Sequence, residues 1–412
     1  MKIFDIAIIG AGPAGMMAGI IAGRNGAEVI LIEKNDSLGR KLLATGNGRC
    51  NITNQNIDVS HYHGSDPDFV LPIFKEFSQK DTVAFFESLG VKLKEEDRGR
   101  LFPNTDQAGT VLASLVKELS TNNVTIKMNS CVKDINFSDC WHVVLANKET
   151  IKARKVILTT GGRAAYHLGS SGDGLFWSQN LKHTIAPIYA ALVPIETVEK
   201  WPERIQGIKT KVKAQAYHQN KLVAENRGDL LFTHYGLSGP AVMGLAGGIA
   251  DLLDCSGASV ELKVDLLPDF SENELIEKIN FLFEKNGAKS ILNNLSELLP
   301  QNLVKQTLAV TKVDLTKKSA ETSRTERASI CRHLKEFSAK VSKLRSLKEA
   351  QVTRGGINTN EVNNQTLESL IATDLYFAGE ILDIYADSGG YNLQWSWSSG
   401  YVSGLSASKT KV

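Results

Sequence analysis

The sequence predicts an α/β fold built around a parallel β-sheet, and two observations carry this prediction. The first is the order of elements at the start of the chain. An apolar strand over Ile3–Ile9 leads into a glycine-rich turn and then into a helix that ends near Gly26. A second apolar strand follows this helix and ends at Glu33. The second is a strand at residues 375–379, near the C-terminus, followed by another glycine turn and a helix. Strands and helices that alternate in this way are typical of a doubly wound sheet.

The first glycine turn, residues 10–15 (GAGPAG), has the spacing of a dinucleotide-binding motif. Gly10 permits a tight turn, Gly12 lets a pyrophosphate approach the backbone, and Gly15 lets the helix pack closely on the strand. The N-terminus of the helix adds free N–H groups and a partial positive charge. Glu33 stands where an acid accepts hydrogen bonds from an adenosine ribose. Together these features predict a Rossmann-like nucleotide-binding domain.

A signal peptide is the competing interpretation of this N-terminus, because Lys2 precedes a fairly apolar run. Asp5, Pro13 and the glycines of the turn interrupt that run, and no small-residue cleavage site fits well. The pattern therefore favours the nucleotide-binding motif.

The composition is that of an ordinary soluble protein, with 42% hydrophobic and 22% charged residues in a chain of 412. The net charge of +2 predicts neither a nucleic acid nor an anionic membrane as a partner. No apolar run reaches the roughly 20 residues that a membrane-spanning helix needs. The five cysteines are scattered without a CxxC pair, so we expect no metal site, no disulfide framework and a cytoplasmic location.

The residue pattern changes in the middle of the chain, and this change predicts an insertion. Strand-like alternation over residues 191–195, 208–217 and 221–232 indicates an antiparallel β unit, whereas residues 271–344 look mostly helical. We therefore expect three segments: a first part of the nucleotide-binding domain at 1–186, an inserted β and helical domain at 187–348 with its helical part at about 270–345, and a C-terminal part at 349–412.

The second glycine turn, residues 388–392 (SGGYN), opens a helix expected over residues 393–407. A parallel sheet can bring both glycine turns to its carboxyl edge. Two such turns suit a long cofactor, because one helix N-terminus would hold a pyrophosphate and the other would point at the N1–C2 carbonyl edge of a flavin. The loop at residues 37–54 adds cations that would balance phosphate or a reduced flavin. The alternatives are a packing helix after a tight turn and a solvated basic loop.

Several of these stretches resemble a known flavoprotein family. They are residues 10–15 with Glu33, 39–54 (GRKLLATGNGRCNITN), 353–357 (TRGGI) and 376–400 (YFAGEILDIYADSGGYNLQWSWSSG). They are similar to NAD(P)/FAD-dependent oxidoreductases, which include aminoacetone-oxidase-like enzymes and bile-acid-induced reductases of 3-oxo steroid double bonds. The resemblance implies non-covalent FAD and a Rossmann-like FAD-binding domain with an inserted antiparallel β domain that carries a helical subdomain.

The resemblance also implies which residues surround FAD. They are Gly10, Gly12, Ala14, Gly15, Glu33, Lys34, Arg40, Lys41, Gly48, Arg49, Thr160, Gly161, Gly379, Glu380, Asp383, Gly390, Tyr391, Asn392 and Leu393. Two positions depart from the family pattern, because Asn47 and Ala386 stand where the family often has glycine. Either change would alter how closely the backbone approaches the ring, and neither removes a charged contact.

Three residues are candidates for the chemistry beside the flavin. Tyr391 and Cys50 are the candidate proton donors, because their motifs should lie next to the ring. Packing is the competing interpretation for both, since a buried cysteine is usually inert and a tyrosine can pack on the flavin. Arg354 would clamp an acidic substrate or stabilise reduced flavin, and a structural ion pair is the alternative.

The function we expect is that of an FAD-dependent oxidoreductase that takes hydride from NAD(P)H and reduces a small, largely apolar acceptor such as an enone. The glycines at residues 244–248 lack the strand and the acid of a second nucleotide motif, so a nicotinamide would bind transiently. The alternatives are a flavin amine oxidase that uses oxygen, an RNA-modifying flavoenzyme, and a non-catalytic flavin-binding regulatory protein. The sequence leaves the oligomeric state open.

Overall fold

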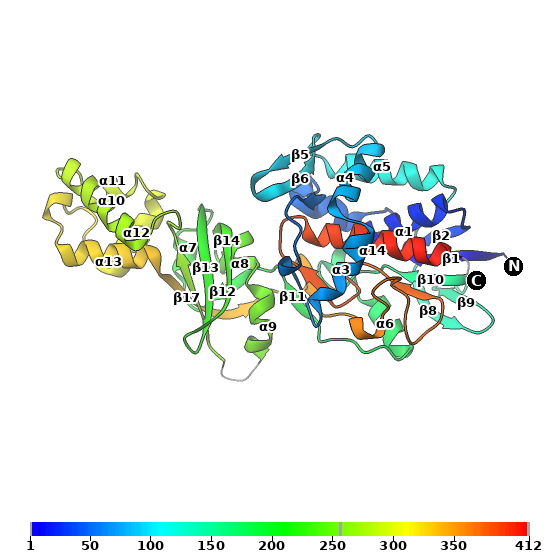
Figure 1. The fold of residues 1–412 in the computed structure, drawn as a ribbon. Helices are drawn as coiled ribbons and strands as arrows, with labels where there is room; N and C mark the ends of the chain where they lie inside the picture. Colours follow the sequence, from blue (N-terminus) through cyan, green and yellow to red (C-terminus); the bar gives the residue numbers. More distant parts are fainter. Residues whose placement is uncertain (1, 255–257, 410–412) are drawn as a thin grey trace. The chain divides into compact units, whose positions relative to one another are not determined.

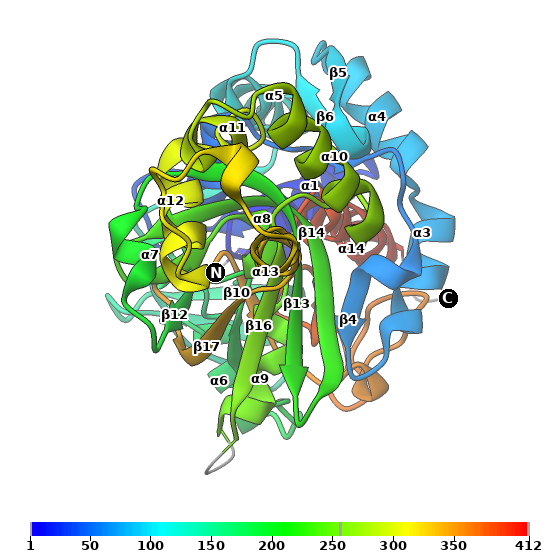
Figure 2. The same cartoon turned by 90° about the vertical axis from the view of Figure 1, so that its left-hand side faces the viewer.

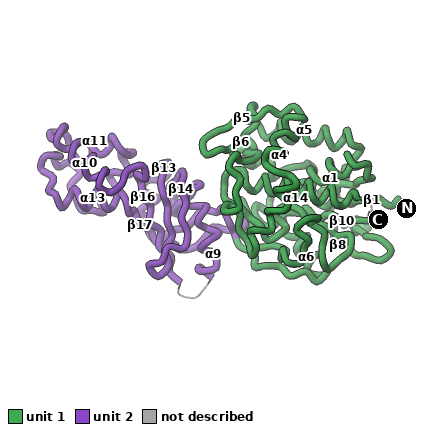
Figure 3. Tube along the Cα trace, in the orientation of Figure 1, with its two compact units in different colours: residues 1–189, 351–412 green, residues 190–350 purple. Residues whose placement is uncertain are grey.

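The computed structural model describes residues 2–254 and 258–409 (Figure 1). The chain divides into two compact units, residues 1–189 with 351–412 and residues 190–350 (Figure 3). The boundaries expected from the sequence, after residues 186 and 348, lie close to these breaks. That the insertion folds as a domain of its own stays a prediction.

Unit 1 contains the parallel sheet that the sequence predicts. The strand order is β7-β2-β1-β10-β9-β8, with β19 also paired to β10. The pairs from β7 to β10, and that with β19, are parallel, whereas β9 and β8 form an antiparallel extension. The strands are β1 (Ile3–Ile9), β2 (Val29–Ile32), β7 (Thr125–Lys127), β8 (Val132–Phe137), β9 (Trp141–Leu145), β10 (Thr150–Leu158) and β19 (Leu375–Phe377).

Two helices, α1 (Pro13–Arg24) and α14 (Tyr391–Ser408), lie side by side although they come from opposite ends of the chain (Figure 1). A Cβ added at Gly400 would lie 2.5 Å from the carbonyl oxygen of Ala14, and one at Gly404 would lie 2.5 Å from that of Ala18. The residue numbers of the two helices increase in the same direction along the contact. The helices are therefore parallel, and their N-termini point the same way.

The other elements of unit 1 are short and surround this core. Local signals explain several of them: Ser78 and Asp81 form a capping box at the start of α4, and α5 buries Val111, Leu115 and Leu119 on one face. These elements are α2 (Arg40–Ala44), α3 (Val70–Glu76), α4 (Gln79–Ser88), α5 (Ala108–Thr121), α6 (Asp173–Asn180), β3 (Thr53–Asn54), β4 (Tyr62–Gly64), β5 (Leu93–Glu96), β6 (Arg100–Pro103), β18 (Val352–Arg354) and β20 (Ile384–Ala386).

Unit 2 contains a closed antiparallel barrel with the order β12-β15-β14-β13-β16-β17 (Figure 2). Alternate residues of β13 face the barrel interior, and Val212, Ala214 and Ala216 are fully buried there. The strands are β12 (Ile195–Thr197), β13 (Lys209–His218), β14 (Lys221–Thr233), β15 (Gly236–Ser238), β16 (Val260–Asp265) and β17 (Phe337–Leu344), and β11 (Tyr189–Ala191) lies where the chain leaves unit 1.

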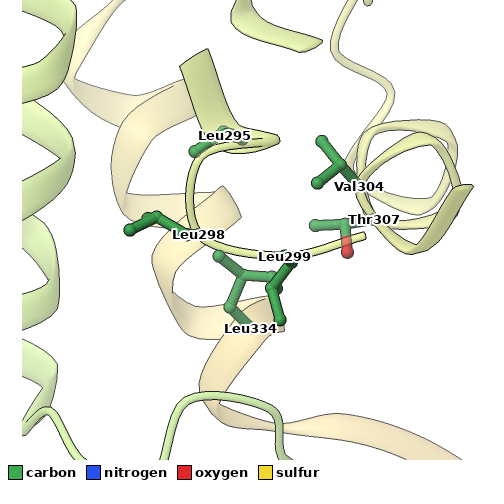
Figure 4. Close-up of a pocket in the computed structure, with 6 residues that line it drawn as sticks. All are labelled: Leu295, Leu298, Leu299, Val304, Thr307 and Leu334. Atoms are coloured by element: carbon green, nitrogen blue, oxygen red, sulfur yellow. The ribbon is translucent and has the colours of Figure 1, made fainter. Parts of the chain in front are cut away.

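The helices of unit 2 share one apolar core with the barrel. A small pocket in this part is lined by leucines, Val304 and Thr307, and it is too narrow to admit a water molecule, so it is a packing seam (Figure 4). The helices are α7 (Trp201–Arg204), α8 (Pro240–Met243), α9 (Ala246–Asp254), α10 (Glu272–Lys285), α11 (Ile291–Leu295), α12 (Gln301–Thr311) and α13 (Arg324–Lys335). In the described part of the chain, no helix has the length and apolar character needed to cross a membrane.

Two expectations for the insertion are wrong. The helical part ends earlier than expected, because Phe337–Leu344 form β17, the strand that closes the barrel. Phe337, Ala339 and Val341 are buried while the residues between them are exposed, which is the period of a strand. The strand expected over residues 191–195 is also divided, since Leu192 has a φ of +48° and separates β11 from β12.

Candidate cofactor and active site

The glycine turn before α1 has the local geometry that its sequence predicts. Gly10 has a φ of +104°, and a Cβ at Gly15 would lie 1.9 Å from the carbonyl oxygen of Gly10. The tight turn and the close packing are therefore confirmed. A Cβ at Gly12 would meet nothing within 4 Å. Gly12 is the N-cap of α1 and offers no side chain to the first N–H groups, so no side chain caps this end of the helix.

The second glycine turn, before α14, is built in a related way. Its N-cap is Gly390, which has a φ of +104° and provides no side-chain cap, and the first turn holds no acid. A Cβ at Gly390 would lie 2.5 Å from the carbonyl oxygen of Thr53, so this turn packs directly on the loop of residues 39–54. Asn54 completes the contact by donating from Nδ2 to the carbonyl oxygen of Gly389 at 2.9 Å. Two stretches that were expected beside a flavin therefore meet here.

The parallel packing of α1 and α14 fixes the offset between the two N-termini. Gly400 lies opposite Ala14, so the N-terminus of α14 extends eight residues beyond the N-terminus of α1 along the shared helix direction. At 1.5 Å per helical residue this offset is about 12 Å. Two partial positive charges thus point toward the same side of unit 1, one well in front of the other. This arrangement suits one extended ligand that has an anionic middle and an electron-rich end.

Glu33 lies at the carboxyl end of β2 and contacts the glycine turn. Its Oε2 accepts a hydrogen bond from the backbone N–H of Ala11 at 2.9 Å, and its Oε1 accepts two from Asn35. Arg40 in turn donates to the side-chain oxygen of Asn35 at 3.0 Å. This network holds the carboxylate beside the turn, at the place expected for the adenosine ribose.

Most of the other expected cofactor cations are paired with acids. Lys34 contacts Asp173 at 2.9 Å, and Lys41 contacts Glu380 at 2.5 Å. Arg49 contacts Glu96 at 2.8 Å and stacks on the ring of Phe102. The structure thus brings Lys41 and Glu380 together, although they are 339 residues apart in the sequence.

Thr353 joins several of the expected segments, and the sequence analysis did not single it out. Its N–H donates to Glu380 at 2.6 Å, and its hydroxyl accepts hydrogen bonds from the N–H groups of Arg163 and Ala164 at 2.8 Å each. The TRGGI stretch therefore ties the loop after β10 to the loop after β19. Thr353 lies within β18, and its place in the TRGGI stretch was the available sequence signal for this role.

Two buried polar atoms near these segments have no hydrogen-bond partner among the residues that the structure describes. They are Oγ1 of Thr160, just after β10, and Oδ1 of Asn51, which lies close to Gly390. An unpaired buried polar atom is costly, so a ligand group that pairs with it would be stabilising. Together with the open space at Gly12 and the two uncapped helices, these atoms fit a dinucleotide-sized flavin.

The two departures from the family pattern keep the backbone compatible with the fold. Asn47 has a φ of +59°, in the left-handed region that asparagine tolerates better than most residues, so it can replace a glycine there. Ala386 is buried at the end of β20, and its N–H donates to the side chain of Asn392 at 2.9 Å. The side chain of Asn392 is thus used within the protein, which leaves its backbone N–H for a ligand.

The structure argues against a catalytic role for Cys50. Its side chain is fully buried, and burial raises the pKa of its thiol to about 12 even though a hydrogen bond with Thr45 lowers it. A thiol that solvent does not reach has no path to a substrate, so the packing interpretation is favoured.

Arg354 is also engaged within the protein. Its guanidinium lies 5.5 Å from the centroid of the Tyr189 ring, and its charge lowers the pKa of Asp383. Burial outweighs this effect and raises the pKa of Asp383 above its ordinary value, while Ser65 donates two hydrogen bonds to the carboxylate. These contacts favour the structural alternative for Arg354.

Tyr391, the third candidate, is the first residue of α14 and packs against a histidine pair that the sequence analysis missed. Its ring stacks on His61 with centroids 4.2 Å apart and an angle of 22° between the planes. Nδ1 of His61 lies 3.0 Å from Oδ2 of Asp387, and Nε2 of His63 lies 2.9 Å from Oδ1 of the same carboxylate. The alternating pattern His-Tyr-His, with buried Tyr62 in the middle, was the available signal.

Among the described residues, one group of side chains brings three possible metal ligands together, namely Asp139, Cys140 and His142. The group lies on the β8–β9 hairpin beside the amino end of β10, at the opposite edge from the cofactor segments. The ammonium of Lys152 lies 3.7 Å from the carboxylate of Asp139, so a cation already neighbours it.

This fold and the pair of uncapped helix N-termini define the class of FAD-dependent oxidoreductases, and the chain is an enzyme of that class. It belongs to the HI0933-like family, because the model of the HI0933-like protein Rossmann domain matches residues 4–406.

Two relatives match along nearly their whole length. The chain is 35% identical over 407 residues to the 3-dehydro-bile acid delta(4,6)-reductase of Clostridium scindens, covering 98% of this chain and 99% of that one. It is 32% identical over 410 residues to the ribosomal RNA dihydrouridine synthase of Escherichia coli, covering 98% and 97%. The solved structure of 3-ketosteroid delta1-dehydrogenase from Sterolibacterium denitrificans, in complex with 1,4-androstadiene-3,17-dione, aligns with a TM-score of 0.52 at 12% identity and covers 99% of this chain and 100% of that one. At that identity the likeness concerns the fold alone.

Proposed function

We propose that this chain is a reductase that takes hydride from NADH or NADPH and adds it to a carbon–carbon double bond conjugated to a carbonyl group. The observation that carries the proposal is the parallel packing of α1 and α14, which offers two uncapped helix N-termini to one extended cofactor. When bound, FAD supplies the hydride chemistry, and the protein supplies position and charge.

The residues expected from the sequence would hold the cofactor as follows. The N-terminus of α1 at Gly12 would receive the pyrophosphate, and Glu33 would accept hydrogen bonds from the adenosine ribose. The N-terminus of α14 at Gly390 would face the N1–C2 carbonyl edge, where negative charge gathers on reduction. Thr160 and Asn51 would each gain a partner for a buried polar atom. The other residues that the sequence predicts around FAD would contact the cofactor between these points.

The relatives' names support the class of acceptor. A delta(4,6)-reductase of a 3-dehydro-bile acid acts, by its name, on double bonds near a 3-oxo group. Dihydrouridine synthesis saturates the double bond of uracil that is conjugated to a carbonyl. By their names, both reactions saturate a carbon–carbon double bond. When such a bond is conjugated to a carbonyl, hydride can add to the β carbon and a proton to the α carbon. We propose a small, largely apolar enone as the acceptor, since the net charge of +2 promises no general affinity for nucleic acid.

Anaerobic half-reactions test this function. The purified protein is expected to be yellow, to be bleached by NADH or NADPH, and to be reoxidised by a 4-en-3-one steroid faster than by buffer without an acceptor. Reduction by amines followed by reoxidation with oxygen would favour an amine oxidase instead. A flavin that neither nicotinamide reduces would contradict the proposal and favour the regulatory alternative.

Uridine in RNA is a second candidate acceptor, and one observation favours it. The helical part of unit 2 carries cations that are exposed and for which no ion pair is found among the described residues. They are Lys305, Lys312, Lys318, Arg324 and Arg332. Such side chains can bind phosphate groups and would make RNA binding depend on salt.

A direct comparison separates the two acceptors. Retention of ribosomal RNA that falls steeply between low and high salt, and that drops when three of these cations are changed to glutamine, would favour RNA. A matched control changes the paired cations Lys317 and Lys335, which contact Glu326 and Asp265. Equal reoxidation by the steroid in all variants, without RNA retention, would favour the small enone.

A further inference from the structure

The histidine pair on Asp387 lies beside the second glycine turn. Asp387 comes just before the glycine turn of α14, and its N–H donates to the carbonyl oxygen of His61 at 3.0 Å. His61 and His63 flank Tyr62 in β4, which pairs with β20. The buried Tyr62 donates its hydroxyl to the carbonyl oxygen of Tyr391, at the start of α14, at 3.1 Å. Both imidazoles are therefore held beside the N-terminus of α14.

The contacts with Asp387 fix which nitrogen of each imidazole remains open. The carboxylate accepts a hydrogen bond at Nδ1 of His61 and at Nε2 of His63. Nε2 of His61 and Nδ1 of His63 are therefore the atoms that can gain or release a proton. About a third of each histidine side chain is exposed, 34% for His61 and 38% for His63, so water can restore a proton that is released.

Asp387 places a negative charge between the two histidines. Burial raises the pKa of Asp387, but the hydrogen bonds from His63 and His61 outweigh it and hold that pKa below its ordinary value. The carboxylate therefore stays ionised and accepts a hydrogen bond from each imidazole.

The other titratable groups that face the pair are mostly neutral at pH 7. Tyr391 stacks on His61 and Tyr385 lies 5.1 Å from the His63 ring, while Tyr62 lies between the histidines in sequence. Burial raises the pKa of Tyr391 and that of Tyr62, so both phenols keep their protons. Asp58 is the remaining acid that interacts with His61, and hydrogen bonds from Ser60 hold its pKa low.

We propose that His61, held by Asp387 and exposed to water, supplies the proton that reduction of the double bond consumes; this rests on the proposed function. FAD, when bound and reduced, would supply the hydride that forms the C–H bond at the β carbon, and the electron pair of the double bond would move onto the carbonyl as an enolate. The N–H bond of the His61 imidazolium breaks and a C–H bond forms at the α carbon. Neutral His61 then regains a proton from water, so the protein is unchanged after each turnover. His63 and Asp387 act as positioning residues.

The test separates the two half-reactions in His61→Gln, His63→Gln and Asp387→Asn, with His167→Gln as the matched control because His167 is exposed and lies outside these segments. FAD content and reduction by NADH or NADPH should match the wild type in all four. Reoxidation by the enone should slow by roughly 10²-fold in His61→Gln, a typical effect of losing a general acid. Reoxidation by ferricyanide, which needs no proton transfer to carbon, should be unchanged. An enone rate in His61→Gln equal to that of the control would overturn the proposal.

A second measurement decides the inference even if no enone is turned over. Histidine side-chain NMR of the wild type at pH 7 should show a His61 ring that carries a proton on both nitrogens, and Asp387→Asn should abolish that state. A neutral His61 ring in the wild type would overturn the proposal. An inert enone together with a doubly protonated His61 would refute the proposed acceptor and leave His61 supported as the proton donor.

Discussion

Gly400 of α14 lies so close to Ala14 of α1 that a Cβ at residue 400 would sit 2.5 Å from the carbonyl oxygen of Ala14. This approach is possible only without a side chain, and it sets the register of two helices whose sequences are almost 400 residues apart. The register places the N-terminus of α14 about 12 Å in front of that of α1. The separation of the two ends of the cofactor site therefore depends on a contact between the first turn of α1 and a residue well inside α14.

Gly400→Ala should damage both the fold and the cofactor site. The new Cβ would collide with backbone, which cannot move aside cheaply, so the free energy of unfolding should fall by about 1–3 kcal/mol and FAD affinity should fall with it. Thermal unfolding and a titration with FAD measure the two effects. The matched control is Gly109→Ala in α5, where a Cβ would meet nothing within 4 Å and stability should stay level or rise. Equal stability of the two variants would show that the helix contact does not set the register.

Gly12→Ala should separate folding from cofactor binding. A Cβ at Gly12 meets nothing within 4 Å and the φ of −77° suits alanine, so the free energy of unfolding of the apoprotein should change by less than about 1 kcal/mol. FAD affinity should nevertheless fall by at least about tenfold, because the pyrophosphate must approach this backbone closely. Gly15→Ala should instead unfold the protein, since its Cβ would lie 1.9 Å from the carbonyl oxygen of Gly10. Unchanged FAD affinity in Gly12→Ala would place the pyrophosphate elsewhere.

Cys50→Ala should leave the chemistry intact. The thiol is buried and its pKa is raised to about 12, so it neither reacts with reagents nor donates a proton to a substrate. The variant should lose roughly 1 kcal/mol of stability and retain its rates of flavin reduction and reoxidation. Native protein treated with iodoacetamide should also keep its activity. A strong loss of enone reoxidation in Cys50→Ala would restore the cysteine as a candidate proton donor.

The acid stability of unit 2 should depend on Glu326. Hydrogen bonds from Lys317 and from the backbone of Ser323, its partner in the capping box of α13, lower the pKa of Glu326 from 4.5 to about 2. A lowered folded-state pKa stabilises the fold above pH 4.5, and this stabilisation is lost as the pH falls toward 2. Because 28% of the side chain is exposed, we expect a contribution of about 1 kcal/mol. Urea unfolding of Glu326→Gln and wild type should differ at pH 6 and converge near pH 2; a constant difference would contradict the pKa.

Local patterns predicted the parts of the site that are local. The tight turn at Gly10 and the close packing at Gly15 follow from spacing alone, and the structure has both. The alternation of apolar and polar residues likewise predicted the strands β13 and β14. The helix expected up to residue 344 was wrong because the charges along β17 resemble a solvated helical face, whereas its alternate residues fill a barrel.

The sequence by itself determined an α/β chain with two glycine turns ahead of helices, because strand period, helix caps and glycine conformations depend on residues close together in the chain. Only the tertiary structure decided that α14 lies parallel to α1 and that Asp387 holds His61, a partner 326 residues away. Such pairs depend on which strands neighbour one another in the sheet and on how closely two helix backbones can approach. The information that determines these pairs is distributed over the whole core and is not contained in any single motif.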